Sequence, residues 1–453
     1  MGTPSWSCHL DAATREQALV IARSIAAAVR DPARLASLVA LANEQSPVVA
    51  ATAWRPSSMN GDVGLALVFG HLAACFPEEG WERDAHRHVE VAARGFERLP
   101  SPEPGMLGGL SGLGLTASYL ARGGQRYGRL LERLDESVSR AARSFADKLL
   151  SQGFGLYMGD FDAVSGISGT MAYLLRRRGT ERVDAALRSA AGALVAMSHE
   201  RDGLPFWHTP ARVVAANPHG LKAEHPEGYL DCGLAHGIPG PLMALSLACS
   251  AGVDVPGLRD AVRRLAEWIV AHRRDDAWGM NWPSVIPLTL DAKGEPEPVL
   301  PSLALGKMTA RSAWCYGAPG IARALWQAGV VLAQPELKDA AVEAIRATLR
   351  RPDAERRLES PTFCHGVAGY LQCVLRFAHE TRLPDLVDAA RDLTRRLVDM
   401  RDEKSALGYR AIEMFDARVD QPGLVDGATG VLAVLLSATV EVEPAWDRAF
   451  LLS

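Results

Sequence analysis

The amino-acid sequence predicts an all-α fold, an (α/α)7 toroid in which seven outer helices surround seven inner ones. Three observations predict it. A G-x-x-G element followed by an apolar run occurs seven times along the chain. An amphipathic segment precedes each copy, and no β-rich window of comparable strength interrupts this alternation. Because neither terminal repeat resembles the polar cap of an open solenoid, we expect the ring to close on itself.

The inner helices are predicted by the glycine-led runs, which are apolar on nearly all sides and should therefore be buried. A glycine at a helix start permits a tight entry and a close approach of neighbouring backbone. The first glycines are 48, 57, 71, 80, 49 and 61 residues apart, a helix-pair period with insertions. The seven runs are 61–74, 109–121, 166–178, 237–250, 317–329, 366–378 and 427–440.

The outer helices are predicted by segments with Arg, Glu and Asp on one face and Leu, Val and Ala on the other, which is typical of a half-exposed helix. They are 15–30, 84–98, 130–150, 181–198, 257–273, 336–350 and 384–400. We therefore expect a single toroid domain over residues 1–453, with loop insertions at about 201–231 and 275–311.

Composition and charge exclude several classes of protein. The 453 residues are 48% hydrophobic and 23% charged, as in a globular protein with a large core. The formal net charge is −4 with interspersed signs, so we expect no nucleic-acid partner. Without a signal peptide or an apolar run of roughly 18–20 residues, we expect no membrane span and a cytoplasmic location. Seven cysteines in such a chain predict free thiols rather than a disulfide framework.

The residues just before each first glycine should line one mouth of the ring, beside exposed helix N–H groups. Ligand types for soft metals fall in the adjacent repeats four, five and six. In repeat order the positions are Asn60, Gly108, Ser165, His236, Cys315 with Tyr316, Cys364 with His365, and Asp426.

Cys315, Cys364 and His365 predict a metal site. Two thiolates and one imidazole leave a fourth position vacant, which is the pattern of catalytic rather than structural Zn²⁺. The positive ends of the helix dipoles would help to keep both thiols ionised. The alternative, inert core cysteines beside a hydrogen-bonded histidine, is weakened by the shared phase of two neighbouring repeats.

Other cysteines have different surroundings. Packing is the better interpretation of Cys75, Cys249 and Cys373, which lie deep inside apolar runs. The role of Cys232, four residues before His236, is left open.

Four polar residues are candidates for catalysis. His236 is either a fourth ligand or a free acid–base group, and we favour the second because proton transfer needs a pKa near neutrality. Asp162 could accept an imidazole N–H or cap its helix. Arg311 is either a catalytic cation or one half of a surface salt bridge. Tyr316 either packs or donates a hydrogen bond at the mouth.

Taken together, WCYG, CHG, GLAHGIPG and the D-x-x-x-G-x-x-G element resemble the lanthionine cyclases, the LanC family of lanthipeptide biosynthesis. The resemblance covers essentially the whole chain. It implies an α/α toroid with zinc held by Cys315, Cys364 and His365. It also implies that the positions of His236, Asp162 and Arg311 take part in catalysis and that Tyr316 lines the site.

Such enzymes join cysteine thiols of a precursor peptide to dehydroalanine or dehydrobutyrine. No dehydratase or kinase domain precedes the toroid, so the resemblance is to the stand-alone type of cyclase. The implied partners are the dehydrated precursor peptide and, in a biosynthetic complex that would bring the protein to the membrane, a dehydratase and an export transporter. The two insertions are candidates for gripping the peptide.

The chemistry expected of this site is thiol addition. Zinc would keep the substrate thiol ionised at neutral pH. The thiolate adds to the β-carbon, charge builds on an enolate oxygen, and the α-carbon is then protonated. We assign the proton transfer to His236 as acid or base, the orientation of its ring to Asp162, and stabilisation of the enolate to Arg311.

Three other functions are open at this point. A LanC-like enzyme would add glutathione to dehydroamino acids by the same chemistry. A peptide-binding scaffold would use zinc only to fasten three repeats together. A toroidal glycosidase would need paired carboxylates across the mouth, and Asp162 and Asp426 are the only obvious pair.

Overall fold

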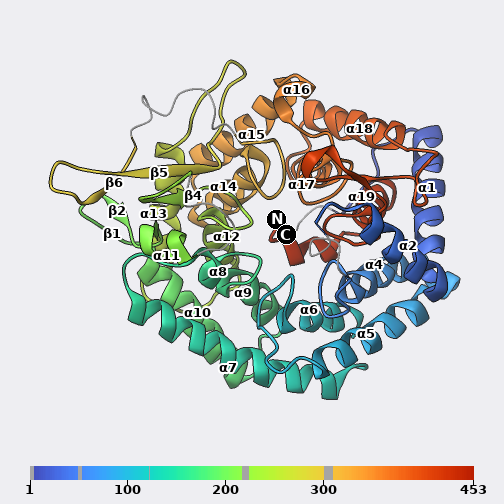
Figure 1. Cartoon of the computed structure of the whole chain (residues 1–453), viewed down its shortest axis with the longest axis horizontal. Coiled ribbons are helices and arrows are strands. Elements are labelled where there is room, and N and C mark those ends of the chain that lie inside the picture. The colour runs from blue at the N-terminus through green and yellow to red at the C-terminus, as the bar shows by residue number, and fades with distance from the viewer. Residues whose placement is uncertain (1–4, 49–53, 122, 217–223, 300–309) are drawn as a thin grey trace.

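The computed structural model describes residues 5–48, 54–121, 123–216, 224–299 and 310–453. In these residues seven outer and seven inner helices alternate around a ring (Figure 1). The inner helices are α4 (Asp62–Cys75), α6 (Leu110–Leu120), α9 (Ile167–Arg176), α12 (Pro239–Ser250), α14 (Ala318–Leu332), α17 (Val367–Thr381) and α19 (Ala428–Thr439). The outer helices are α1 (Ala12–Arg30), α5 (Trp81–Glu97), α7 (Gly128–Gln152), α10 (Glu181–Met197), α13 (Leu258–Ala271), α15 (Pro335–Arg350) and α18 (Pro384–Asp399).

The predicted all-α toroid is confirmed, and each predicted run lies within three residues of an observed helix at both ends. The first glycine of the repeat is the N-cap residue of six of the seven inner helices. The exception is α12, whose N-cap is Ile238, one residue after the glycine. The repeat phase read from the sequence is therefore the phase of the structure.

The ring closes through its first and last repeats. The last inner helix, α19, contacts the first inner helix, α4, and the N-terminal outer helix α1 packs on α19. The N-terminal segment thus supplies the outer partner of the C-terminal inner helix. This pairing leaves no end repeat exposed, whereas an open solenoid exposes the repeat at each end. The prediction of a closed ring is therefore confirmed.

Steric room explains the two glycines of the repeat, as the fifth copy shows. Gly317 has φ 110°, and a Cβ there would lie 1.8 Å from the carbonyl oxygen of Arg311. At Gly320 a Cβ would lie 2.4 Å from the carbonyl oxygen of Trp314 and 2.8 Å from Cβ of Leu234. The first glycine permits the tight entry, and the second lets the preceding repeat approach the helix.

The two insertions form a sheet that the sequence did not predict. Strands β3 (Thr209–Pro210), β4 (Gly228–Asp231), β5 (Val285–Leu290) and β6 (Pro296–Pro298) pair antiparallel in that order. Each strand is short, and the two central ones come from different insertions, so no single window carries the pattern. Part of each insertion, residues 217–223 and 300–309, lies outside the described residues.

The C-terminal segment fills the centre of the ring, where Figure 1 shows the C-terminus. Its 3₁₀ helix η3 (Ala445–Phe450) contacts α4, α6 and α9, and Trp446 and Phe450 are fully buried. Buried Asp447 accepts hydrogen bonds from Arg376 of α17. The inner helices therefore pack around the end of the chain as well as against one another.

Shorter elements connect the repeats. They are α2 (Pro32–Gln45), η1 (Pro77–Glu79), α8 (Met158–Phe161), β1 (Glu200–Arg201), β2 (Leu204–Pro205), α11 (Ala211–Ala216), α16 (Asp353–Arg356), β7 (Ala411–Ile412), η2 (Met414–Asp416) and β8 (Arg418–Val419). None of the helices in the described residues has the length and apolar character that crossing a membrane requires.

Candidate metal centre

The loops that enter the inner helices are joined into one closed circuit of hydrogen bonds. In each bond a backbone N–H of one loop donates to the next repeat. The bonds run from Met59 to Leu107 O (2.8 Å), Leu107 to Val164 O (3.0 Å), Ala163 to Ala235 O (3.0 Å), Ala235 to Cys315 O (3.2 Å), Cys315 to Cys364 O (3.3 Å), Cys364 to Val425 O (2.9 Å) and Val425 to Asn60 Oδ1 (3.1 Å). Six links are between backbones, and an asparagine side chain makes the seventh. The residues before the glycines therefore share one rim.

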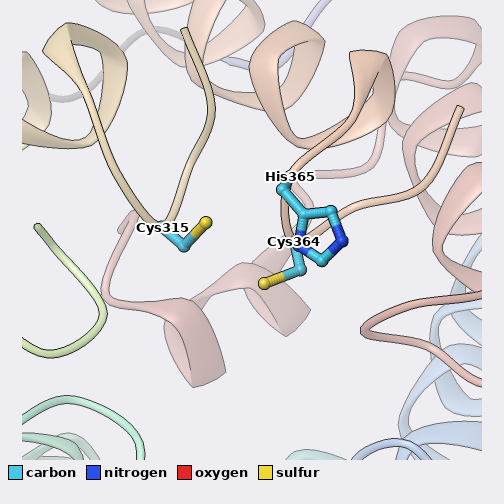
Figure 2. Close-up of side chains that lie close together, drawn as sticks. All are labelled: Cys315, Cys364 and His365. Carbon is cyan, nitrogen blue, oxygen red and sulfur yellow. The ribbon is translucent and has the colours of Figure 1, made fainter. Parts of the chain in front are cut away.

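On this rim Cys315, Cys364 and His365 come together as predicted. One sulfur from each cysteine and a ring nitrogen of the histidine all lie within 4.8 Å of one another. Figure 2 shows the two sulfurs pointing into the space between the two loops. Cys315 is buried, whereas the other two are partly exposed. This donor set fits a Zn²⁺ ion, which accepts thiolate and imidazole ligands in close approach.

The electrostatics of the cluster favour one ionised sulfur. The hydrogen bond donated by Cys364 lowers the pKa of Cys315 well below that of a free thiol, with help from His365 and against the effect of burial. The bond to Cys315 correspondingly raises the pKa of Cys364 and that of His365. A thiolate is therefore available at Cys315 for a metal ion.

Buried aromatic side chains anchor the two loops that carry the cysteines. Trp314 and Phe363 directly precede the two ligands, are almost fully buried, and have ring centroids 5.6 Å apart. The Trp314 indole donates a hydrogen bond to the carbonyl oxygen of Phe450 at 2.9 Å. The C-terminal segment in the centre of the ring thus holds Trp314, the residue before Cys315, in place.

Asp162 contacts the imidazole of the next repeat and the loop before α9, but it does not cap α9, whose N-cap residue is Gly166 without a side-chain cap. Its Oδ2 lies 2.7 Å from Nδ1 of His236, in the next repeat. Its Oδ1 accepts the backbone N–H groups of Val164, Ser165 and Gly166, just before α9. Burial lowers the pKa of His236, but the bond and charge of Asp162, with the charges of Asp231 and Cys315, raise it overall. In the described residues His236 lies outside the metal cluster.

Tyr316 is held by a carboxylate that the sequence did not single out. The phenol donates a hydrogen bond to Oδ2 of Asp231 at 2.9 Å, and Oδ1 of Asp231 accepts the N–H of Gly233 at 2.9 Å. Burial is the main cause that raises the pKa of Asp231 to about 6. Because Asp231 ends strand β4 and stands six residues before Gly237, it lies outside the repeat column, and no repeat signal marks it.

Arg311 lies exposed beside the cluster. Its positive charge contributes to lowering the pKa of Cys315. It makes no side-chain ion pair with the described residues, so the predicted surface salt bridge is not seen there.

Four other cysteines pack in the core or at its edge. Burial raises the pKa of Cys75 and of Cys373 to about 12 and that of Cys232 well above its ordinary value. Cys249 is partly buried in α12. Cys232 is 3% exposed, and its thiol makes one weak contact, 3.8 Å, to the carbonyl oxygen of Leu230. None of the four belongs to the metal cluster in the described part of the chain.

A glycosidase site is disfavoured by the same geometry. Both oxygens of Asp162 are occupied, one by three backbone N–H groups and one by His236. Asp426, the other member of the pair, is near the charge of His365, although burial raises its pKa. Asp162 is therefore poorly placed to protonate or attack a sugar.

Comparisons with known proteins find similarity over most of the chain. The family model of the lanthionine synthetase C-like proteins matches residues 52–451. The nisin biosynthesis protein NisC of Lactococcus lactis subsp. lactis is 21% identical over 316 residues, which cover 68% of this chain and 70% of that protein. The solved structure of nisin cyclase superposes with a TM-score of 0.72 at 19% identity, over 92% of this chain and 96% of that one. The chain belongs to the lanthionine synthetase C-like family.

Proposed function

We propose that this protein is a zinc-dependent peptide cyclase. It adds cysteine thiols of a dehydrated precursor peptide to dehydroalanine or dehydrobutyrine and so forms lanthionine or methyllanthionine rings. The observation that carries the proposal is the cluster of Cys315, Cys364 and His365 at the mouth of the ring. Three protein ligands would leave the fourth position of a tetrahedral Zn²⁺ ion to a substrate sulfur. Membership of the lanthionine synthetase C-like family and the similarity to NisC support the same reaction.

Zinc held by these three residues would supply a thiolate at neutral pH, because coordination lowers the pKa of a thiol far below its free value of about 8.5. The seven inner helices begin at this rim, so the positive ends of their dipoles converge on it. Developing negative charge on an enolate oxygen is favoured in such a field. The exposed guanidinium of Arg311 adds to it from the rim.

His236 transfers the proton of the addition, either as the base that takes it from the substrate thiol or as the acid that gives it to the α-carbon. Its Nδ1 is engaged by Asp162, which leaves Nε2 as the atom that can exchange a proton with the reacting peptide. The side chain of His236 is 33% exposed, so a substrate can reach it. A scaffold with purely structural zinc has no need of an oriented, reachable imidazole with a raised pKa, which is why the enzyme is favoured.

The substrate peptide is bound by the sheet β3–β6, which the two insertions form. Strand β4 ends at Asp231, which is bonded to Tyr316 beside the metal cluster, so this sheet adjoins the site. We also propose that residues 1–453 act as one domain, since closing the ring uses both its first and last repeats. Action in the cytoplasm, alone or in a complex with a dehydratase and an export transporter, completes the proposal.

The test is turnover of a dehydrated precursor peptide that carries both cysteine and dehydroalanine, with and without free glutathione. Cyclisation consumes peptide thiols without changing the mass, whereas glutathione addition increases the mass by that of the tripeptide. We expect loss of alkylatable thiols at constant mass in both samples. Adducts that form only with glutathione would assign the LanC-like activity instead. A peptide that is unchanged in both samples would favour the alternative of a peptide-binding scaffold with structural zinc.

His236→Asn should keep its zinc and lose cyclisation by about 100-fold or more, the usual range for removal of a general acid–base group. His86→Asn is the matched control, since that imidazole is 54% exposed on outer helix α5. Equal turnover in His236→Asn would remove the imidazole from the mechanism.

A further inference from the structure

We propose that Asp231 is a positioning residue for cyclisation, which holds the phenol of Tyr316 in one orientation at the rim of the metal cluster. The inference rests on the proposed function. Asp231 takes no part in bond making. It acts through Tyr316, which donates a hydrogen bond from its hydroxyl to Asp231 at 2.9 Å. Tyr316 is the next residue in the chain after Cys315 of the metal cluster.

The carboxylate is fixed by the insertion sheet before it meets the phenol. Asp231 is 3% exposed and, as the last residue of β4, pairs with Val285, the first residue of β5. The next residue continues this contact, with the N–H of Cys232 donating to the carbonyl oxygen of Ser284 at 2.9 Å. Because the carboxylate of Asp231 is held by the sheet, it cannot shift with the side chain of Tyr316. The position of the carboxylate therefore determines the position of the phenol.

The turn after Asp231 also confines the ring of Tyr316. A Cβ at Gly233 would lie 2.6 Å from Cδ1 and from Cε1 of that ring and 2.7 Å from the carbonyl oxygen of Cys315. The backbone at Gly233 therefore packs against one edge of the phenol ring, and the N–H of Gly233 donates a hydrogen bond to Asp231. The hydroxyl and one ring edge of Tyr316 are thus held by the same three-residue turn.

Two rings at the mouth are held in the same way. Asp162 and Asp231 are both buried, and each uses one oxygen for backbone N–H groups and the other for a side chain of the site. The rings that they hold, His236 and Tyr316, have centroids 6.4 Å apart. Because the phenol proton is engaged by Asp231, the oxygen of Tyr316 presents its lone pair to the peptide. It can therefore accept a substrate N–H group beside the metal cluster.

The proposal is tested with a double-mutant cycle of Asp231→Asn and Tyr316→Phe, with turnover and bound zinc measured for each protein. An asparagine has one carbonyl oxygen for two donors, so either the phenol or the Gly233 N–H loses its acceptor. We expect each single variant to lower kcat about 10-fold or more with unchanged zinc content. The double variant should be no slower than Tyr316→Phe alone, because Asp231 acts through that phenol.

Gly233→Ala adds a methyl group that must displace the ring of Tyr316 or the carbonyl oxygen of Cys315. We expect a similar loss of kcat, together with a lower zinc content because Cys315 belongs to the metal cluster. The matched control is Tyr173→Phe, which removes a buried tyrosine–aspartate bond of 2.5 Å to Asp135, between α9 and α7. That variant should lose stability and keep its kcat.

Wild-type kcat in Asp231→Asn would overturn the proposal, as would losses that multiply in the double variant. Failure of Asp231→Asn to accumulate as a folded, zinc-loaded protein would also overturn it, because the carboxylate would then serve the fold alone. An inactive wild-type protein would instead contradict the cyclase function on which the inference rests, and the two failures are therefore distinguishable.

Discussion

Asp162 shows how single residues build this site. One of its oxygens ends the loop before α9 by accepting three backbone N–H groups, and the other orients His236. The ring of His236 is consequently oriented by the same carboxylate that holds the loop before a neighbouring inner helix. A buried anion beside an imidazole stabilises the protonated ring and so raises its pKa.

This pairing predicts the pH dependence of kcat. The pKa of His236 is raised, so the limb that it produces in the profile should lie above pH 6.5. Activity falls with pH through that limb if the protonated ring is needed and rises if the neutral ring is needed. Asp162→Asn removes the anion and should move the limb to lower pH in either case. A limb that stays in place in that variant, measured over roughly pH 5 to pH 9, would contradict the pairing.

The proximity of Cys315, Cys364 and His365 could be predicted from the sequence because repetition placed them. Cys315 and Cys364 occupy equivalent positions in adjacent repeats, and closure of the ring turns that equivalence into proximity. Asp231 could not be predicted in this way. It belongs to an insertion, outside the repeat phase, and it meets Tyr316 across 85 residues through a strand pairing that no local pattern encodes.

At the scale of elements, the helices follow from local periodicity and the insertion sheet does not. The inner runs are apolar all round, and a glycine marks where each begins, so local sequence suffices. Strands β3 and β4 come from one insertion and β5 and β6 from the other. Their pairing depends on two segments that the toroid brings together, which is a property of tertiary structure.

Gly317 provides a test of the repeat geometry. Its φ of 110° and the carbonyl of Arg311, 1.8 Å from any added Cβ, exclude a side chain without backbone movement. We expect Gly317→Ala to lower the free energy of unfolding by about 3 kcal/mol or more and to reduce bound zinc, because Cys315 is two residues away. Urea denaturation and metal analysis measure both effects.

The matched control for this substitution is Gly192→Ala in outer helix α10. A Cβ there has no neighbour within 4 Å. This variant should gain about 0.5–1 kcal/mol in the free energy of unfolding, because alanine restricts the unfolded chain and favours helix. Equal effects of the two substitutions would show that Gly317 has no special role.

The whole molecule is stabilised by closure and by its centre. The outer helix α1 pairs with the last inner helix, and the C-terminal segment fills the interior beside Trp314, the residue before Cys315. The sequence predicted the closed ring from the absence of polar end repeats. It did not predict the central segment, because residues 445–450 carry no repeat motif, and Trp446, Asp447, Ala449 and Phe450 become buried only once the seven inner helices surround them.

Asp447 tests the importance of that centre. It is fully buried and accepts hydrogen bonds from Arg376 and Gln372 of α17. Asp447→Ala leaves the Arg376 charge buried with a single carboxylate partner, Glu443, and should lower the free energy of unfolding by about 3–5 kcal/mol. Asp392→Ala, which breaks an exposed pair with Arg395, should change it by less than about 1 kcal/mol. Similar urea midpoints for the two variants would contradict a stabilising central segment.

The central claim, a three-ligand zinc site open to a substrate sulfur, is tested most directly by the visible spectrum of the cobalt(II)-substituted protein before and after addition of a thiol peptide. We predict one metal ion per chain, loss of that ion in Cys315→Ala and Cys364→Ala, and a stronger sulfur-to-cobalt absorption when the thiol is added. A protein that binds no stoichiometric metal, or a spectrum that the thiol leaves unchanged, would contradict the account.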